Sequence, residues 1–174
     1  MSELSLPQTR LSRIVDPTLA RIGVMTSWLW LILLAVIVTN VVLRYAFGEG
    51  RIEFEELQWH LYALAFLVGM SYTLQKDSHI RVDVLHERFE PRTKAWVELY
   101  GILLFLLPFI ALMLIFSTPF VAVSFQVGEV SSSPGGLPYR WLIKAIIPIA
   151  FLMLLFAALS RLSRVWMFLF GARS

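Results

Sequence analysis

The sequence contains no cysteine and few charged residues, and these two absences exclude several classes of protein. Without cysteine the chain cannot form disulfide bonds, bind an iron–sulfur cluster through thiolates or use a thiol nucleophile. Charged residues make up only 16% of the 174 residues, whereas a soluble domain has about 25%. Hydrophobic residues make up 58%, and the mean hydropathy is +0.73. We therefore expect a membrane protein that folds as one domain over residues 1–174.

Long runs without a charged residue predict the membrane-spanning helices. The first run, residues 22–43, is longer than the core of a signal peptide and long enough to cross a bilayer, so we expect a retained helix. With their flanks, the predicted spans are residues 24–46, 53–75, 96–125 and 139–159. The third span is longer than one perpendicular crossing requires, so it should tilt, bend or protrude. Pro108 and Pro119 are its candidate kinks.

The segment between the second and third spans differs from the rest of the chain. Helix two should begin near Glu53, since carboxylates are stabilised in a first helical turn, and Pro91 suits the first position of helix three. Between these helices the sequence HIRVDV at 79–84 alternates as a strand would, yet Val82, Leu85 and Phe89 could also share one helix face. We favour a short amphipathic helix at the membrane surface. The predicted fold is an all-α integral membrane protein with four transmembrane helices and this interfacial helix.

The basic residues predict the orientation of the chain. Four spans place both termini on one side, and eleven Lys and Arg residues fall on that side against four on the other. By the positive-inside rule the N-terminus (1–21) and the C-terminal tail (161–174) are cytoplasmic. The acidic hairpin after helix one and the Ser/Gly/Pro-rich loop at 127–138 then face outward.

Few residues within the spans could carry chemistry. Asn40, Gln58 and His60 are polar, but His60 has no second histidine in the spans with which to bind haem. The residues His79, Asp83, His86 and Glu87 could be imagined as a metal cluster, but a solvated charged face is the simpler interpretation. The serines at 131–133 have no histidine nearby in sequence to activate them. We expect no enzyme activity, metal or cofactor, and no nucleic-acid partner.

Glu55 and Glu56 have two interpretations. They can stabilise the start of helix two at the lipid surface. Alternatively, they can pair with Arg44 or Arg51 across the hairpin, or with an arginine on a partner. Arg44 itself could extend its side chain to the lipid headgroups.

Several of these residues together resemble a known family. The elements are Arg44-Tyr45-Ala46-Phe47, the pair Glu55-Glu56 before Leu57, Gly69, the segment His79-Ile80-Arg81-Val82-Asp83, Gly136-Leu137-Pro138 and Pro148. The chain is similar in these features, in length and in its four spans to the small membrane subunit (DctQ-type) of the tripartite ATP-independent periplasmic transporters. One departure is that members often carry a tryptophan just before the acidic pair, where this chain has Glu53-Phe54.

The resemblance implies a function and a set of partners. In this family a periplasmic binding protein delivers an organic acid, such as a dicarboxylate or sugar acid, to two subunits in the bacterial inner membrane. The large permease subunit moves the substrate with an ion, usually sodium. The small subunit is a scaffold in contact with membrane lipid, which clamps the large subunit and helps dock the binding protein.

The resemblance also suggests which residues carry these roles. Interface or structural roles fall on Asn40, Arg44, Glu55, Glu56, Gly69, His79, Arg81, Asp83 and Pro148. Candidate docking residues on the outer side are Glu49, Glu53, Glu129 and Arg140. Residues 79–89 would anchor the assembly at the cytoplasmic surface.

Other functions remain open from the sequence. A stand-alone four-helix exporter has a similar size, although residues 22–43 contain no membrane-embedded carboxylate. A membrane anchor for a redox complex would need more histidines. A pure assembly factor would differ only in its partner.

Overall fold

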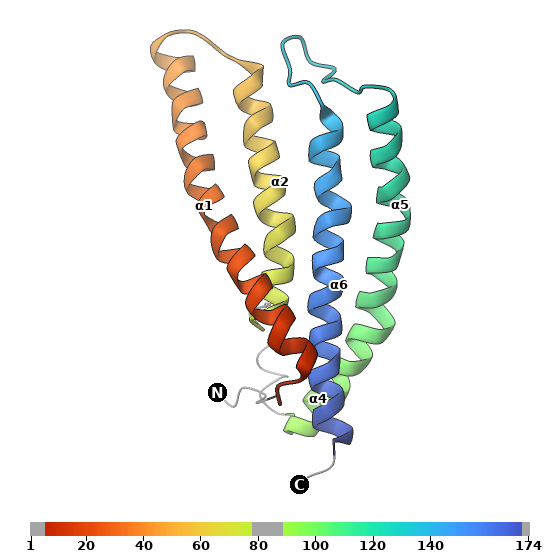
Figure 1. Ribbon diagram of the computed structural model, residues 1–174. Helices are drawn as coiled ribbons and strands as arrows, with labels where there is room; N and C mark the ends of the chain where they lie inside the picture. The colour runs from red at the N-terminus through yellow and green to blue at the C-terminus, as the bar shows by residue number, and fades with distance from the viewer. Residues whose placement is uncertain (1–5, 78–88, 172–174) are drawn as a thin grey trace.

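The computed structural model describes residues 6–77 and 89–171 and shows four long helical rods side by side (Figure 1). All regular structure in these residues is helical, as predicted. The elements are α1 (Arg10–Ala46), α2 (Ile52–Gln75), α4 (Pro91–Tyr100), a π-helical segment (Gly101–Leu106), α5 (Leu107–Gln126) and α6 (Arg140–Phe170). The segment α4, the π-helical turn and α5 form one continuous rod. The predicted interfacial helix at 79–89 falls almost wholly outside the described residues.

The rods form an open layer with α6 in its middle. Helix α6 packs against α1, α2, α4 and α5, whereas α5 packs mainly on α6 and α1 packs mainly on α2. Both ends of the described chain lie at one end of the layer, here called the terminal end (Figure 1). The α1–α2 connection (47–51) and the α5–α6 loop (127–139) lie at the opposite end, here called the loop end.

Helix α1 begins well before the apolar run, because its first turn is capped. The Thr9 hydroxyl oxygen accepts a hydrogen bond from the Ser12 backbone N–H at 3.1 Å, and the Ser12 hydroxyl oxygen accepts one from the Thr9 N–H at 2.9 Å. This reciprocal capping box satisfies donors that the helix cannot satisfy itself. Residues 10–23, which were expected to precede the first span, therefore belong to a helix of 37 residues.

The wide π-helical turn lies directly before Pro108. The backbone N–H of Leu107 donates to the carbonyl of Ile102, five residues earlier, and Pro108 has no N–H to donate. A proline inside a helix also crowds the carbonyl four residues before it, and a wider turn relieves this contact. Of the two candidate kinks, Pro108 thus follows a π-helical turn, whereas Pro119 lies within α5. Pro91 occupies the start of α4, and α2 begins one residue before Glu53, as expected.

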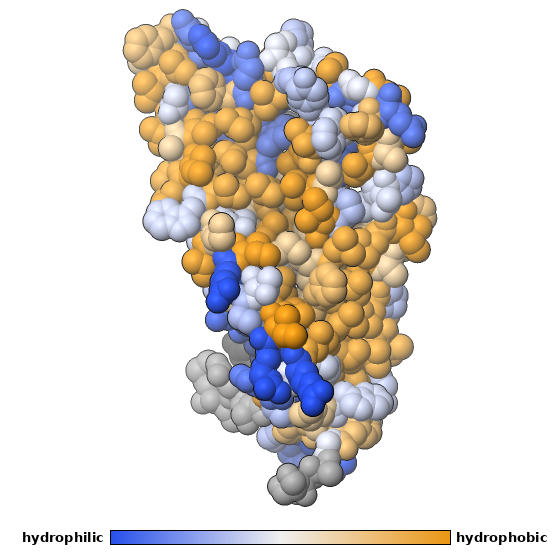
Figure 2. Space-filling view, viewed as in Figure 1, coloured by the Kyte–Doolittle hydropathy of each residue, from blue (hydrophilic) through white to orange (hydrophobic). Residues whose placement is uncertain are grey.

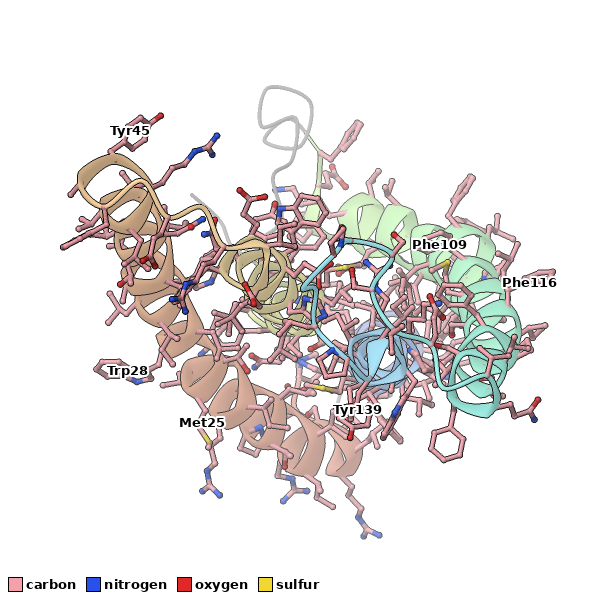
Figure 3. All side chains as sticks on the ribbon, turned by 90° about the horizontal axis from the view of Figure 1, so that it is seen from above. Met25, Trp28, Tyr45, Phe109, Phe116 and Tyr139 are labelled. Atoms are coloured by element: carbon pink, nitrogen blue, oxygen red, sulfur yellow. The ribbon has the colours of Figure 1, made fainter. Side chains whose placement is uncertain are left out.

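Most of the surface along the rods is apolar. Figure 2 shows a largely hydrophobic face, with hydrophilic residues gathered mainly toward the two ends. Within the described residues, three stretches are long and apolar enough to cross a membrane, namely Arg10–Ala46, Pro91–Gln126 and Arg140–Phe170. Helix α2 is not among them, since its 24 residues include Gln58 and His60. Large side chains such as Trp28 and Phe116 point away from the layer, as Figure 3 shows from above.

A single seam along α6 organises the core. Phe151, Leu154 and Ala158 are buried against Ile102 and Ile110 of the neighbouring rod. Toward the terminal end the same side of α6 continues with Val165, which packs on Ala95 and Leu99. Because this seam extends past residue 160, the stretch expected to be a tail from 161 is helical as far as Phe170.

Candidate functional site: polar clusters at the two ends of the layer

A buried arginine joins three helices at the terminal end. The Arg161 side chain is only 5% exposed, and its Nη2 lies 2.9 Å from the Asp77 carboxylate just after α2. Its Nε donates a hydrogen bond to the Glu98 carboxylate of α4. A buried cation is tolerated when it is paired and hydrogen-bonded, and two carboxylates here meet that condition. The cluster therefore fixes α2, α4 and α6 relative to one another.

A second polar cluster attaches α1 to α6 beside the first. The Ser160 hydroxyl donates to Asp16 at 2.6 Å, and Arg164 lies 3.5 Å from the other oxygen of the same carboxylate. The hydroxyl groups of Thr9 and Ser163 are 2.8 Å apart. With the Arg161 cluster, these contacts connect all the helices that meet at this end.

Reasoning from the sequence missed both clusters. From the sequence, Glu98 is only a charge near the beginning of the third predicted span, and Arg161 and Arg164 are two of the basic residues that predict the orientation. The available signal was that Glu98 and Arg161 both border apolar runs, at the same predicted side of the membrane. Charges that are equally deep on neighbouring helices can pair, but sequence alone does not specify which helices are neighbours.

At the loop end, Glu56 holds the α5–α6 loop. Glu56 is only 6% exposed. Its carboxylate accepts hydrogen bonds from the Leu137 backbone N–H at 2.6 Å and from the Ser131 hydroxyl group. The loop passes close to this carboxylate at Gly136, where a Cβ atom would overlap the Ser131 side chain. Two roles were predicted for Glu56, stabilising the start of a helix or pairing with an arginine, and the structure adds one that was not predicted, as an acceptor for a distant loop.

The base of the same loop carries an ion pair. Lys144 of α6 donates a hydrogen bond to the Glu129 carboxylate, and its Nζ also lies 4.0 Å from the centre of the Phe120 ring. The Lys144 hydrogen bond and charge, together with the Arg140 charge, lower the pKa of Glu129 below its usual range. The Arg140 N–H donates to the Glu129 carbonyl at 3.1 Å. Glu129 and Arg140, predicted as docking residues, thus lie together and also stabilise the loop.

The remaining hairpin charges are exposed. Arg44 lies 3.8 Å from Glu55 across the α1–α2 connection, one of the pairings considered for Glu55. Glu49 pairs with its near neighbour Arg51 at 3.1 Å. Such exposed pairs contribute about 0–1 kcal/mol each, so these groups remain available to a partner. Glu53 is also exposed, near Gly135 of the α5–α6 loop.

The other predicted interface residues are dispersed over the layer. Asn40 is buried on α1, and Pro148 lies partly buried within α6. Gly69 lines an apolar groove of about 480 Å³ between α1 and α2, together with Gly23, Trp30, Phe66 and others. His79, Arg81 and Asp83 lie outside the described residues, so their anchoring role stays a prediction.

The polar clusters consist of carboxylates, cations and hydroxyl groups that contact one another. His60 Nδ1 contacts the Glu56 carbonyl of its own helix, which is a structural contact. Across residues 6–77 and 89–171, no three His, Asp or Glu side chains are grouped as metal ligands. Carboxylates and arginines that satisfy one another can hold helices and loops in place, and this is the chemistry that the arrangement supports.

Comparison with protein families identifies the chain. The family described as the DctQ component of tripartite ATP-independent periplasmic transporters matches residues 33–168. The chain belongs to this family. As a DctQ component it is part of a transporter of the bacterial inner membrane, and its apolar helices agree with this location. Neither the comparison with curated proteins nor that with solved structures gives a match.

The DctQ match covers most of the polar residues at both the terminal end and the loop end. It includes Glu56, Asp77, Glu98, Glu129 and Arg161, but begins after the capped first turns of α1 and after Asp16.

Proposed function

We propose that this chain is the small permease subunit of a tripartite transporter that imports an organic acid, such as a dicarboxylate or sugar acid. An ion gradient, with sodium as the coupling ion, drives the import. In this proposal the large permease subunit binds the substrate and the ion. The present chain clamps that subunit in the membrane and helps dock the periplasmic binding protein.

The distribution of charge carries this proposal. The runs 22–43, 57–75, 99–128 and 145–160 contain no Asp, Glu, Lys or Arg. The buried Arg161 and the half-buried Lys144 are both paired within the subunit. A subunit with its own transport pathway generally carries ionisable groups inside the membrane. A scaffold does not need them, and here the charges connect helices of the same chain.

The proposal includes four membrane crossings, with α2 as the second. Its 24 residues extend over about 36 Å, enough for a hydrocarbon layer of about 30 Å. It also packs between α1 and α6, two of the helices that are apolar enough to span. The termini are then cytoplasmic, and the predicted anchor segment at 79–89 belongs to the same side.

Single cysteines test this topology cleanly, because the natural chain has none. We expect a membrane-impermeant maleimide to label cysteines at Gly48 and Ser132 in intact spheroplasts. Cysteines at Thr18 and Thr93 should be labelled only after lysis. Equal labelling at Gly48 and Thr93 would show that α2 does not cross the membrane.

Copurification tests the function itself. The tagged chain, expressed with its large permease subunit and extracted in mild detergent, should retain that subunit at a one-to-one ratio, as quantified by mass spectrometry. Recovery of the chain alone or as a homodimer would refute the scaffold function. Transport by the purified chain alone in liposomes would favour an exporter instead.

A further inference from the structure

The α5–α6 loop (127–139) is ordered by contacts with a helix distant in sequence. One oxygen of Glu56 accepts the Leu137 N–H at 2.6 Å, and the other accepts the Ser131 hydroxyl hydrogen. The Ser131 oxygen in turn accepts the Ser133 N–H at 3.2 Å, and the Ser131 N–H donates to the Leu137 carbonyl at 3.3 Å. Seen from above, the loop lies over the end of the layer (Figure 3). A single carboxylate therefore holds the two sides of the loop together, one at Ser131 and the other at Leu137.

The loop can reach this carboxylate only because residue 136 is glycine. A Cβ atom at Gly136 would overlap Ser131 and lie 2.9 Å from the Glu56 oxygen. Gly135 beside it has a φ of +79°, which L side chains rarely adopt. The short side chains at 131–136 and the carboxylate thus fit one loop conformation.

Val130 and Tyr139 are among the large side chains that this conformation exposes. They are 62% and 64% exposed, and Tyr139 has left-handed backbone angles of φ 60° and ψ 47°. Such angles are unusual for a bulky aromatic residue and persist only where the surroundings enforce them. The Tyr139 carbonyl accepts the Leu142 N–H at 3.0 Å, which helps to hold the residue at the start of α6.

The chemistry of the loop suits a protein partner outside the membrane core. Its Ser- and Gly-rich backbone has polar groups that hydrocarbon cannot satisfy, so the loop belongs outside the membrane core. Exposed apolar side chains on such a surface are typical of protein contacts, and tyrosine is enriched at them because it combines an apolar ring with a hydroxyl group. The ordered loop also avoids part of the entropy lost when a flexible loop binds.

We infer that Glu56 is a positioning residue that holds the α5–α6 loop so that Val130 and Tyr139 contact the periplasmic binding protein. This inference rests on the proposed function, in which that protein docks at the loop end. Glu56 does not touch the binding protein itself. It acts through the loop.

Binding to the assembled complex tests the inference. The chain and the large permease subunit are reconstituted in nanodiscs, and binding of the fluorescently labelled binding protein is measured. We expect Glu56→Ala to raise the Kd about tenfold, equivalent to losing a hydrogen bond to a charged group. Glu56→Gln retains an acceptor for Leu137 and should lie closer to the natural chain. Tyr139→Asn keeps a residue that tolerates left-handed angles but removes the ring, and should also weaken binding.

A spin label at a cysteine introduced at Ser132 reports the loop conformation independently. Its mobility should increase with Glu56→Ala and with Gly136→Ala, but not with Tyr139→Asn. Gly50→Ala is the matched control for the glycine change, because nothing lies within 4 Å of a Cβ atom there. If Glu56→Ala does not fold, Ser131→Ala removes only one of the two hydrogen bonds and should show a smaller effect in both measurements.

The outcomes separate this inference from the proposed function. Normal binding by both Glu56→Ala and Tyr139→Asn would overturn the inference and leave the proposed function standing. Loss of the large subunit from Glu56→Ala, with an unchanged spin-label spectrum, would show that Glu56 serves assembly instead. No binding by the natural complex would overturn both.

Discussion

Replacing Arg161 with methionine should destabilise the subunit strongly, because it removes the cation that is paired with the largely buried Glu98 carboxylate. Methionine has a similar length and preserves much of the packing, but Glu98, whose side chain is 17% exposed, then loses the Arg161 charge. Breaking a buried ion pair from one side costs about 3–5 kcal/mol. Asp77 is 29% exposed and can turn toward water, so we expect the lower part of this range, about 3 kcal/mol.

The effect can be measured as a shift in thermal unfolding. For a chain of this size, about 3 kcal/mol corresponds to a loss of about 6–12 °C in Tm. The six tryptophans permit a fluorescence measurement in detergent at a fixed scan rate. Arg21→Met, at an exposed arginine of α1, is the matched control and should change the Tm by no more than about 2 °C.

A double variant tests the electrostatic cause. Glu98→Gln removes the charge that Arg161→Met leaves without its partner, so the double variant should recover much of the lost Tm. A double variant no more stable than Arg161→Met would refute the reasoning. So would a Tm loss for Arg161→Met no larger than that of the Arg21 control.

Two further predictions concern the loop and the groove. Lys144→Met removes the main cause of the lowered pKa of Glu129, which should rise toward its ordinary value of 4.5. A lowered carboxyl pKa stabilises the folded loop above the ordinary pKa, and this contribution is lost as the pH falls through the folded value. A spin label in the loop should therefore become mobile at a higher pH in Lys144→Met than in the natural chain, and equal midpoints would contradict the assignment. In α1, Gly23→Ala should lower the Tm despite the better helix propensity of alanine, because its Cβ would overlap the Tyr72 ring. Gly69→Ala, which meets nothing within 4 Å, should be neutral or stabilising by up to about 1 kcal/mol; equal shifts would show that the groove wall is not tightly packed at Gly23.

The sequence predicts the helices well because apolar runs and helix-start signals are local. Pro91 at the start of α4 and the beginning of α2 near Glu53 follow from neighbouring residues alone. The early start of α1 was not predicted, because its capping box precedes a stretch outside the apolar run, within the predicted cytoplasmic N-terminus (1–21). Pro108 was predicted as a candidate kink, but the sequence did not specify the form that the helix takes there, a π-helical turn.

The polar clusters could not be predicted, because each joins residues far apart in the chain. Glu55 and Glu56 are adjacent, yet one faces Arg44 at the surface and the other is buried under the α5–α6 loop. Successive helical residues point about 100° apart, so the order of the helices decides which carboxylate meets which partner. Likewise Arg161 and Glu98 are 63 residues apart and become neighbours only once α6 has packed beside α4.

The central place of α6 has a consequence for how the subunit is made. Helices α1 and α2 contact each other along their length and can pair as soon as both have left the ribosome. Helix α5 packs mainly on α6, and Glu98 of α4 pairs with Arg161 of α6, so this rod gains most of its contacts with other helices only when α6 is synthesised. Helix α6 follows these helices in the chain and completes their packing, so a ribosome that stops before α6 releases a helix pair and a rod without its main packing partner.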